Sequence, residues 1–141
     1  MSKISISEHD AEGPDPLPGR DLAGYLIRYP RQITFGDTDP GNVMDRYHTP
    51  DFAMTNDGFV LDRDRLLAHV QSGRKRAADI RVEVHECMVD GDSVAARYTL
   101  TATMRKGQLI ATEIYMFGRL APDGRLRHVD QLTRTVPTAN P

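Results

Sequence analysis

The second half of the chain carries the pattern that most restricts its fold. Between residues 80 and 136, apolar and polar side chains alternate over four stretches, separated by the turn sequences DGD at 90–92, KGQ at 106–108 and APDG at 121–124. Alternation of this kind predicts strands with one buried and one exposed face. Because short turns join antiparallel neighbours, we expect a four-stranded antiparallel meander.

The first half shows helical spacing instead. Apolar residues three and four positions apart predict helices that begin after Asp21, after Asp39 and near Asp62, and Asp21 and Asp39 are suitable N-caps. Pro30 lies inside the first pattern and is expected to kink or end that helix. The third helix is expected to stop near Gly73.

A short hairpin is expected between the second and third helices. The segments DFAMT and FVL flank the turn sequence NDG at 56–58. Helices that precede long strands are typical of the α+β class. Long strands twist and bend, so helices over the concave side of such a sheet leave a conical cavity suited to a ligand. We therefore predict an α+β fold, a cone-shaped curved antiparallel sheet with about three N-terminal helices packed over its concave face (a cystatin-like α+β barrel).

The chain divides into one domain with short ends. Residues 1–20 are polar and hold three prolines and two glycines, so we expect a flexible N-terminal segment. The domain spans 21–136, and residues 137–141 form a C-terminal tail.

Composition and motifs exclude several classes of protein. A net charge of −2 argues against general nucleic-acid binding, and no apolar stretch predicts a membrane span or a signal peptide. The single cysteine, Cys87, cannot form an internal disulfide, so a cytoplasmic location is the default. There is no dinucleotide or P-loop motif and no zinc-type cluster, so we expect no cofactor and no metal.

Several motifs, in this order, resemble a known family. They are Gly36–Asp37, MDRYHTPDF at 44–52, LDRDRLLAHV at 61–70, DGDSVAARYTLTAT at 90–103 and EIYMFGRLAPDGRLRHVDQLTR at 113–134. Over about residues 21–136 the chain resembles the SnoaL-like branch of the nuclear transport factor 2 superfamily, which includes ketosteroid isomerases and polyketide cyclases. The resemblance implies an α+β cone, usually a homodimer that packs the outer face of its sheet.

The resemblance also implies catalytic residues. SnoaL-like cyclases use an aspartate of the last strand as general base, with a histidine near it, and Asp130 and His128 stand at about that place. If they face inward with Leu126 and Leu132, apolar surroundings would raise the pKa of the Asp130 carboxyl and make it a better base. If the parity is reversed, Arg127, Val129 and Gln131 face the pocket, and the pair lies at a dimer interface. Asp130 could also simply pair with an arginine of a neighbouring strand.

Four further residues are candidates for ligand binding. Tyr47 could place its hydroxyl in the cavity as an oxyanion donor, Tyr98 and Tyr115 lie within expected strands, and Met54 would add a soft apolar wall. The alternative for each of the four is an ordinary core residue, which is the more common role of such side chains.

Two functions follow from these observations. The first is a small-molecule-binding, cofactor-free isomerase, cyclase or hydratase that uses general acid/base catalysis on an apolar carbonyl or polyketide-like compound. The alternative is a non-catalytic homodimeric module that binds a ligand or another protein. Both predict an apolar small-molecule or protein partner, a homodimer, and no contact with nucleic acid or membrane.

Overall fold

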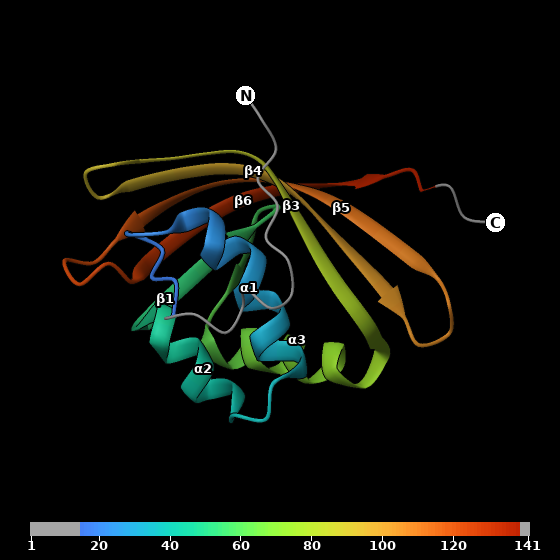
Figure 1. Cartoon of the computed structure of the whole chain (residues 1–141). Coiled ribbons are helices and arrows are strands. Elements are labelled where there is room, and N and C mark those ends of the chain that lie inside the picture. Colours follow the sequence, from blue (N-terminus) through green and yellow to red (C-terminus); the bar gives the residue numbers. More distant parts are fainter. Residues whose placement is uncertain (1–14, 139–141) are drawn as a thin grey trace.

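The computed structural model describes residues 15–138, in which three helices and six strands follow one another (Figure 1). The helices are α1 (Leu22–Phe35), α2 (Pro40–Tyr47) and α3 (Arg63–Arg76). The strands are β1 (His48–Asn56), β2 (Phe59–Leu61), β3 (Ala77–Asp90), β4 (Ser93–Met104), β5 (Leu109–Leu120) and β6 (Leu126–Val136). The predicted α+β architecture, with helices over one face of a curved sheet, is confirmed.

Each helix begins at the aspartate that the sequence predicts. The carboxylates of Asp21, Asp39 and Asp62 accept hydrogen bonds from backbone N–H groups in the first turns of α1, α2 and α3, at 2.9, 3.3 and 2.9 Å. These bonds satisfy donors that have no partner within the helix, so the caps define where the helices start.

Two of the helices, α1 and α3, end later than the sequence predicts. α1 continues past Pro30 to Phe35, and α3 passes Gly73 and ends at Arg76. Ile33 lies beyond the proline and is only 3% exposed, so its burial in the core stabilises the last turns of α1. Tertiary packing thus outweighs the local preference against proline in a helix.

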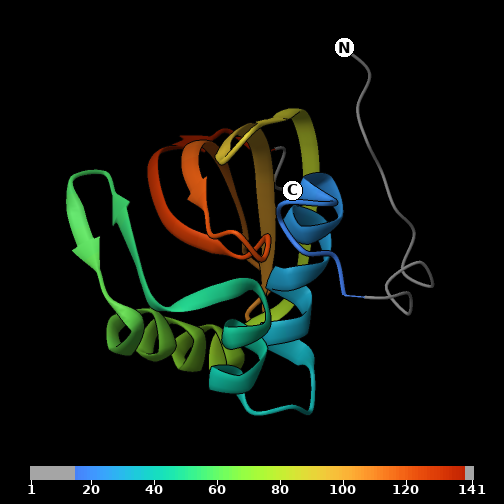
Figure 2. The same cartoon turned by 90° about the vertical axis from the view of Figure 1, so that its left-hand side faces the viewer.

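The six strands form one mixed sheet in the order β2-β1-β6-β5-β4-β3. The predicted meander, β3 to β6, is antiparallel throughout, and β1 and β2 form the predicted hairpin. The hairpin joins the same sheet because β1 pairs with β6, and this pairing is parallel. Figure 2 shows the curvature of the sheet and the β1–β2 hairpin projecting beyond it beside α3.

An extra residue in β6 reverses the side-chain alternation of that strand. Arg119 of β5 lies opposite His128, but the next residue, Leu120, lies opposite Leu126. Arg127 is therefore the extra residue of a β-bulge. As a result Leu126 and Val129, three positions apart, both point into the core, with 0% and 2% exposure.

The hydrophobic core lies between the helices and the concave face of the sheet. Helical residues such as Leu26 and Val43 pack with strand residues such as Val84, Val94 and Leu126. No helix within residues 15–138 is both long enough and apolar enough to cross a membrane.

The expected flexible segment, residues 1–20, lies largely outside the described residues. The part that is described packs on the domain. Pro18 is fully buried, and the Gly19 N–H donates to the Gly124 carbonyl at 2.9 Å. This contact ties residues 15–20 to the turn between β5 and β6.

Because Gly118 has no side chain, neighbouring atoms can pack closely against its backbone. A Cβ at this position would stand 2.9 Å from Val94 Cγ2 and 3.1 Å from the His128 carbonyl oxygen. We therefore expect Gly118→Ala to lower the free energy of unfolding by about 1–3 kcal/mol, through overpacking. Urea denaturation measures this change.

Gly73→Ala is the matched control. A Cβ at Gly73 would meet nothing within 4 Å, and this glycine lies inside α3. Replacing a helical glycine with alanine in open space should raise stability by about 0.5–1 kcal/mol. If Gly118→Ala behaved like Gly73→Ala, the close approach at Gly118 would not constrain the fold.

Candidate functional site in the cone

A cavity of about 750 Å³ lies between the concave face of the sheet and the helices. All three helices and all six strands contribute to its walls, and most of the side chains are apolar or aromatic, including Leu26, Phe52, Leu100 and Ile114. No aspartate or glutamate of the described chain lines it. The volume and the apolar lining suit an organic molecule of modest size.

A tyrosine and a histidine form a hydrogen-bonded pair in the wall of this cavity. The Tyr25 hydroxyl lies 2.7 Å from His48 Nε2, and His48 Nδ1 lies 2.8 Å from the Met44 carbonyl oxygen. Because a carbonyl can only accept, Nδ1 carries the ring hydrogen and donates it to Met44. Nε2 then accepts from the Tyr25 hydroxyl, so the unshared electron pairs of the tyrosine oxygen remain available for a ligand.

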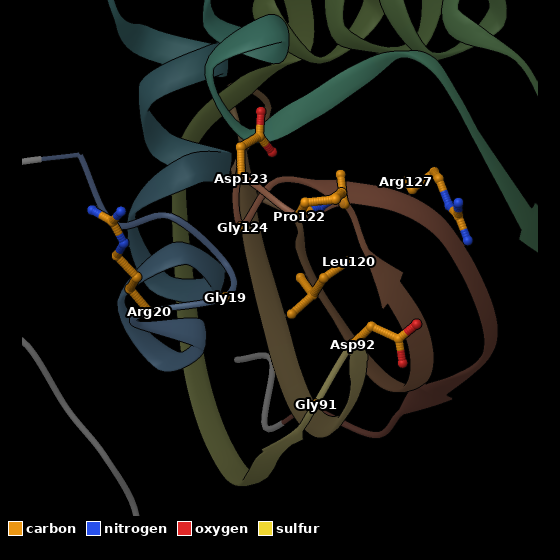
Figure 3. A pocket seen from close by; sticks show the side chains of 10 residues that line it. Gly19, Arg20, Gly91, Asp92, Leu120, Pro122, Asp123, Gly124 and Arg127 are labelled. Atoms are coloured by element: carbon orange, nitrogen blue, oxygen red, sulfur yellow. The ribbon is translucent and has the colours of Figure 1, made fainter.

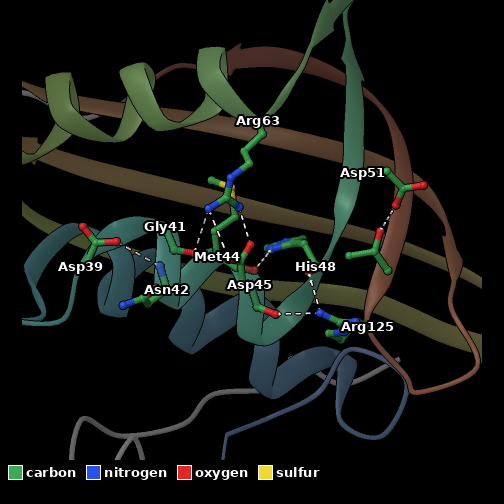
Figure 4. Close-up of polar contacts among 10 residues, drawn as sticks. Asp39, Gly41, Asn42, Met44, Asp45, His48, Asp51, Arg63 and Arg125 are labelled. Atoms are coloured by element: carbon green, nitrogen blue, oxygen red, sulfur yellow. Dashed lines mark hydrogen bonds and ion pairs between the residues drawn. The ribbon is translucent and has the colours of Figure 1, made fainter.

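Two arginines hold the backbone around His48 in place (Figure 4). His48 follows the last residue of α2 and is the first residue of β1. Arg63 of α3 pairs with the Asp45 carboxylate, and Arg125 donates to the carbonyl oxygens of Asp45 and His48 at 3.1 and 3.4 Å. Contacts from both sides therefore fix the helix-to-strand junction that positions the imidazole.

Burial keeps both members of the pair neutral. It lowers the pKa of His48 to about 4, against smaller opposing effects from the Met44 carbonyl and the Asp45 carboxylate. Burial, with the neighbouring Tyr29, Tyr98 and Tyr47, raises the pKa of the Tyr25 hydroxyl well above its usual value. At neutral pH the imidazole is therefore an uncharged acceptor and the phenol an uncharged donor.

Aromatic rings surround the pair and limit its movement. The Tyr25 ring stacks on Tyr29 with centroids 5.3 Å apart, and the His48 ring lies 4.5 Å from that of Phe52. Rings packed at these distances leave little rotational freedom, so the hydrogen bond between Tyr25 and His48 is pre-organised.

Two amide side chains from β1 and β6 also line the cavity. Gln131 Nε2 donates to Asn56 Oδ1 at 2.9 Å. Gln131 faces inward because the bulge at Arg127 reverses the alternation of β6. This side chain occupies the inward position next to Asp130, where the sequence left the parity open.

His128 and Asp130 lie together on the outer face of the sheet. His128 Nε2 is 3.0 Å from Asp130 Oδ1, and their side chains are 42% and 62% exposed. Neither residue lines the cavity. The structure therefore adopts the reversed parity, and the catalytic role of this pair stays a prediction that the cavity geometry does not support.

Of the four predicted ligand-binding residues, two line the cavity and two do not. Tyr98 and Met54 line the cavity. Tyr47 is buried, and its hydroxyl bonds to Gln32 and, at 3.2 Å, to Asp15 rather than facing the cavity. Tyr115 lies on the outer face, where its hydroxyl donates to Glu113 at 3.1 Å.

The sequence-based candidates did not include Tyr25 or His48, and they placed Gln131 in the pocket only for the reversed parity. His48 stands within the motif at 44–52 that carries the family resemblance, and Tyr25 lies one turn from the apolar residues of the first helix. Neither residue carries a local signal that distinguishes it from a core residue, because their contact joins positions 23 residues apart.

A second hollow, of about 520 Å³, lies among the turns at the opposite end of the sheet (Figure 3). It is lined by exposed residues that include Arg20, Asp92, Asp123 and Arg127. The two aspartates already pair with Arg119 and Arg125, at 3.2 and 2.8 Å. No buried polar group points into this hollow from the described residues, so the cone cavity is the better candidate.

The same part of the chain contains no group of three or more histidine, cysteine, aspartate or glutamate side chains placed to hold a metal ion.

Comparison with known proteins identifies the family. A family model of the SnoaL-like domain matches residues 28–129. The chain belongs to this family. No curated protein sequence matches the chain.

Solved structures share the fold at low sequence identity. AclR from Streptomyces galilaeus, a candidate hydroxylase, is 19% identical with a TM-score of 0.60 over 75% of this chain and 83% of that chain. IdmH from Streptomyces antibioticus, a candidate polyketide cyclase, is 18% identical with a TM-score of 0.60 over 79% and 88%. An NTF2-like protein from Exiguobacterium sp. 255-15 is 15% identical with a TM-score of 0.59 over 76% and 95%. At these identities the likeness establishes a common fold.

The lowered pKa of His48 makes stability depend on pH. The unfolded chain binds a proton at its histidine near pH 6.5, whereas folded His48 binds one only near its pKa of about 4. Stability is therefore complete above the unfolded pKa and falls as the pH falls toward 4. We expect a loss of roughly 2 kcal/mol from this residue between pH 7 and pH 5.

Urea denaturation at the two pH values, with His48→Gln as the control, measures this loss. The variant carries no titrating group at position 48, so its stability should change less between pH 7 and pH 5. A direct check is the imidazole NMR titration, in which one histidine should stay neutral down to about pH 4. Titration of every histidine near pH 6.5 would contradict the assignment.

Proposed function

We propose that this SnoaL-like protein binds an apolar carbonyl or polyketide-like compound in the cone cavity. There it catalyses an isomerisation, cyclisation or hydration without a cofactor, through Tyr25 and His48. The observation that carries the proposal is the hydrogen bond of 2.7 Å between these two side chains in the wall of a largely apolar cavity. General acid/base catalysis needs such a positioned pair, shielded from water.

The two side chains can move a proton as a relay. A substrate C–H beside a carbonyl, or a substrate hydroxyl, gives its proton to the Tyr25 oxygen, while the Tyr25 hydroxyl proton passes to His48 Nε2. The products of this step are an enolate or alkoxide, neutral Tyr25 and an imidazolium. No free tyrosinate forms, which matters because burial strongly disfavours it.

Two groups beside His48 partly offset the cost of forming a buried imidazolium. Its Nδ1–H already donates to the Met44 carbonyl, and the nearby Asp45 carboxylate favours the charged ring. When the proton returns through Tyr25 to another atom of the product, the pair regains its starting state. The proposed cycle therefore needs no external acid or base.

Asn56 and Gln131 form a separate polar contact in the cavity wall. Gln131 Nε2 donates to the Asn56 carbonyl oxygen at 2.9 Å, which leaves the Asn56 NH₂ group for other partners. Asn56 stands eight positions after His48 in β1, roughly 25 Å along an extended strand. In this proposal Asn56 therefore contacts a part of the ligand distant from the reacting carbon.

The first test uses Tyr25→Phe, which removes only the hydroxyl. With 1-tetralone as probe, the wild-type protein should catalyse exchange of the hydrogens beside the carbonyl for deuterium, measured by proton NMR in D₂O. We expect the variant to lose about 100-fold in exchange rate, the usual size of one general acid/base contribution.

Asp130→Asn is the matched control for this experiment. Asp130 is exposed on the outer face, away from the cavity lining, so this variant should keep full exchange activity. Loss of activity in Asp130→Asn with activity retained in Tyr25→Phe would reverse the assignment and favour the residues first expected from the family resemblance. A wild-type protein that binds 1-tetralone but catalyses no exchange would support the non-catalytic alternative.

The outer face of the sheet supports a second part of the proposal, a homodimer. Phe117 and Leu132 are 71% and 65% exposed there, and Tyr115 lies directly opposite Leu132 in the sheet. Beside them Arg97 and Arg134 flank the Glu113 carboxylate at 3.1 and 2.7 Å. Adjacent exposed apolar side chains mark an interaction surface, and a second copy would cover them.

Phe117→Asp tests the homodimer. A charge placed within an apolar interface loses its water and finds no partner, so we expect this variant to be a monomer. Size-exclusion chromatography with light scattering measures the mass. Val60→Asp is the control, because Val60 is also exposed but lies on β2 at the far edge of the sheet. A monomeric wild-type protein would contradict the proposal.

A further inference from the structure

Within the described chain, the lining of the cone cavity carries positive charge without a balancing negative charge. Among the described residues that line it, Arg76 is the single arginine or lysine, and no aspartate or glutamate is present. Apart from Arg76, the titratable side chains of the lining are tyrosines and the histidines His48 and His69. A cavity with a cation and no balancing carboxylate favours a ligand that carries negative charge.

One face of α3 gathers the polar groups of this wall. His69, Gly73 and Arg76 stand at positions i, i+4 and i+7, which share one side of a helix, and all three line the cavity. A Cβ built at Gly73 would meet no atom within 4 Å, so the cavity wall is open at this position of α3. A small polar group of a ligand could approach the helix there.

The Arg76 guanidinium is not needed to hold the fold together. The carbonyl oxygens at the end of α3 are bound by Arg105, whose N–H donates to Arg76 at 2.8 Å and whose guanidinium donates to Arg74 at 3.2 Å. The Arg74 guanidinium binds carbonyl oxygens after α1, among them Gly36 and Thr38.

By contrast, the Arg76 side chain is exposed and makes no hydrogen bond or ion pair with another residue of the range 15–138. It is therefore available to a ligand. An exposed guanidinium whose N–H groups have no partner can bind a carboxylate through two parallel hydrogen bonds.

We infer that the ligand is an amphiphile with an apolar body and a carboxylate, and that Arg76 binds the carboxylate at the α3 side of the cavity. This inference rests on the proposed binding of a small molecule in the cone, and it adds the chemical class of that molecule. The apolar body occupies the part lined by residues such as Leu26 and Ile114. The anion stays beside exposed Arg76, because transfer of a carboxylate into the apolar interior is costly.

Three ligands with the same tail test the inference. Octanoate, octan-1-ol and octylammonium differ in the charge of one end, and isothermal titration calorimetry at low salt measures their affinities. For the wild-type protein we expect octanoate to bind most tightly and octylammonium least. Arg76→Gln should weaken octanoate about fivefold and leave octan-1-ol unchanged, as expected for one partly exposed ion pair.

Lys75→Gln is the matched control. It removes the same charge from the neighbouring position of α3, but Lys75 does not line the cavity. This variant should keep the octanoate affinity of the wild type. Arg76→Lys should restore part of the loss, because it returns the charge without the planar pair of donors.

The outcomes separate this inference from the function on which it rests. If octan-1-ol shifts the His48 ring resonances but octanoate binds no more tightly than the alcohol, the cavity binds apolar molecules and the role of Arg76 is wrong. Equal weakening of octanoate and octan-1-ol in Arg76→Gln would also contradict it, since the residue would then act on the cavity as a whole. If none of the three ligands perturbs His48, both proposals fail.

Discussion

The extra residue at Arg127 determines which side chains of β6 face the cone cavity. It shifts β6 by one position relative to β5, so Val129 and Gln131 turn inward while His128 and Asp130 turn outward. Because side chains alternate strictly along a strand, one inserted residue changes the direction of all that follow it. The cavity consequently contains an amide where an inward Asp130 would have placed a carboxylate.

No aspartate or glutamate of the described chain lines the cavity, and the proposed proton transfer uses the neutral side chains of Tyr25 and His48. Burial makes the charged forms of Tyr25 and His48 unfavourable, and the Met44 carbonyl selects the tautomer in which Nε2 accepts. The same burial that lowers the basicity of His48 also keeps its hydrogen bond to Tyr25 free of competing water. Arg63 and Arg125 hold the junction between α2 and β1, which places this pair in the wall.

Much of the architecture could be predicted from local patterns. Alternation identified the meander, aspartate caps located the helix starts, and the turn at 56–58 identified the hairpin. The parallel pairing of β1 with β6 could not be predicted in this way, because it joins strands about 75 residues apart. Nor could the parity of β6 be predicted, since exposed Leu132 and buried Leu126 belong to one apparent apolar series.

By itself the sequence determined the class of fold, the order of its elements, the family and the apolar character of the cone, because these follow from periodicity and from short motifs. Only the tertiary structure decided which polar groups line the same cavity. Tyr25, His48, Gln131 and Arg76 come from α1, β1, β6 and α3, and their places in the cavity wall depend on strand register and helix packing. Such contacts are set by the burial of the whole core, which no single segment of the chain encodes.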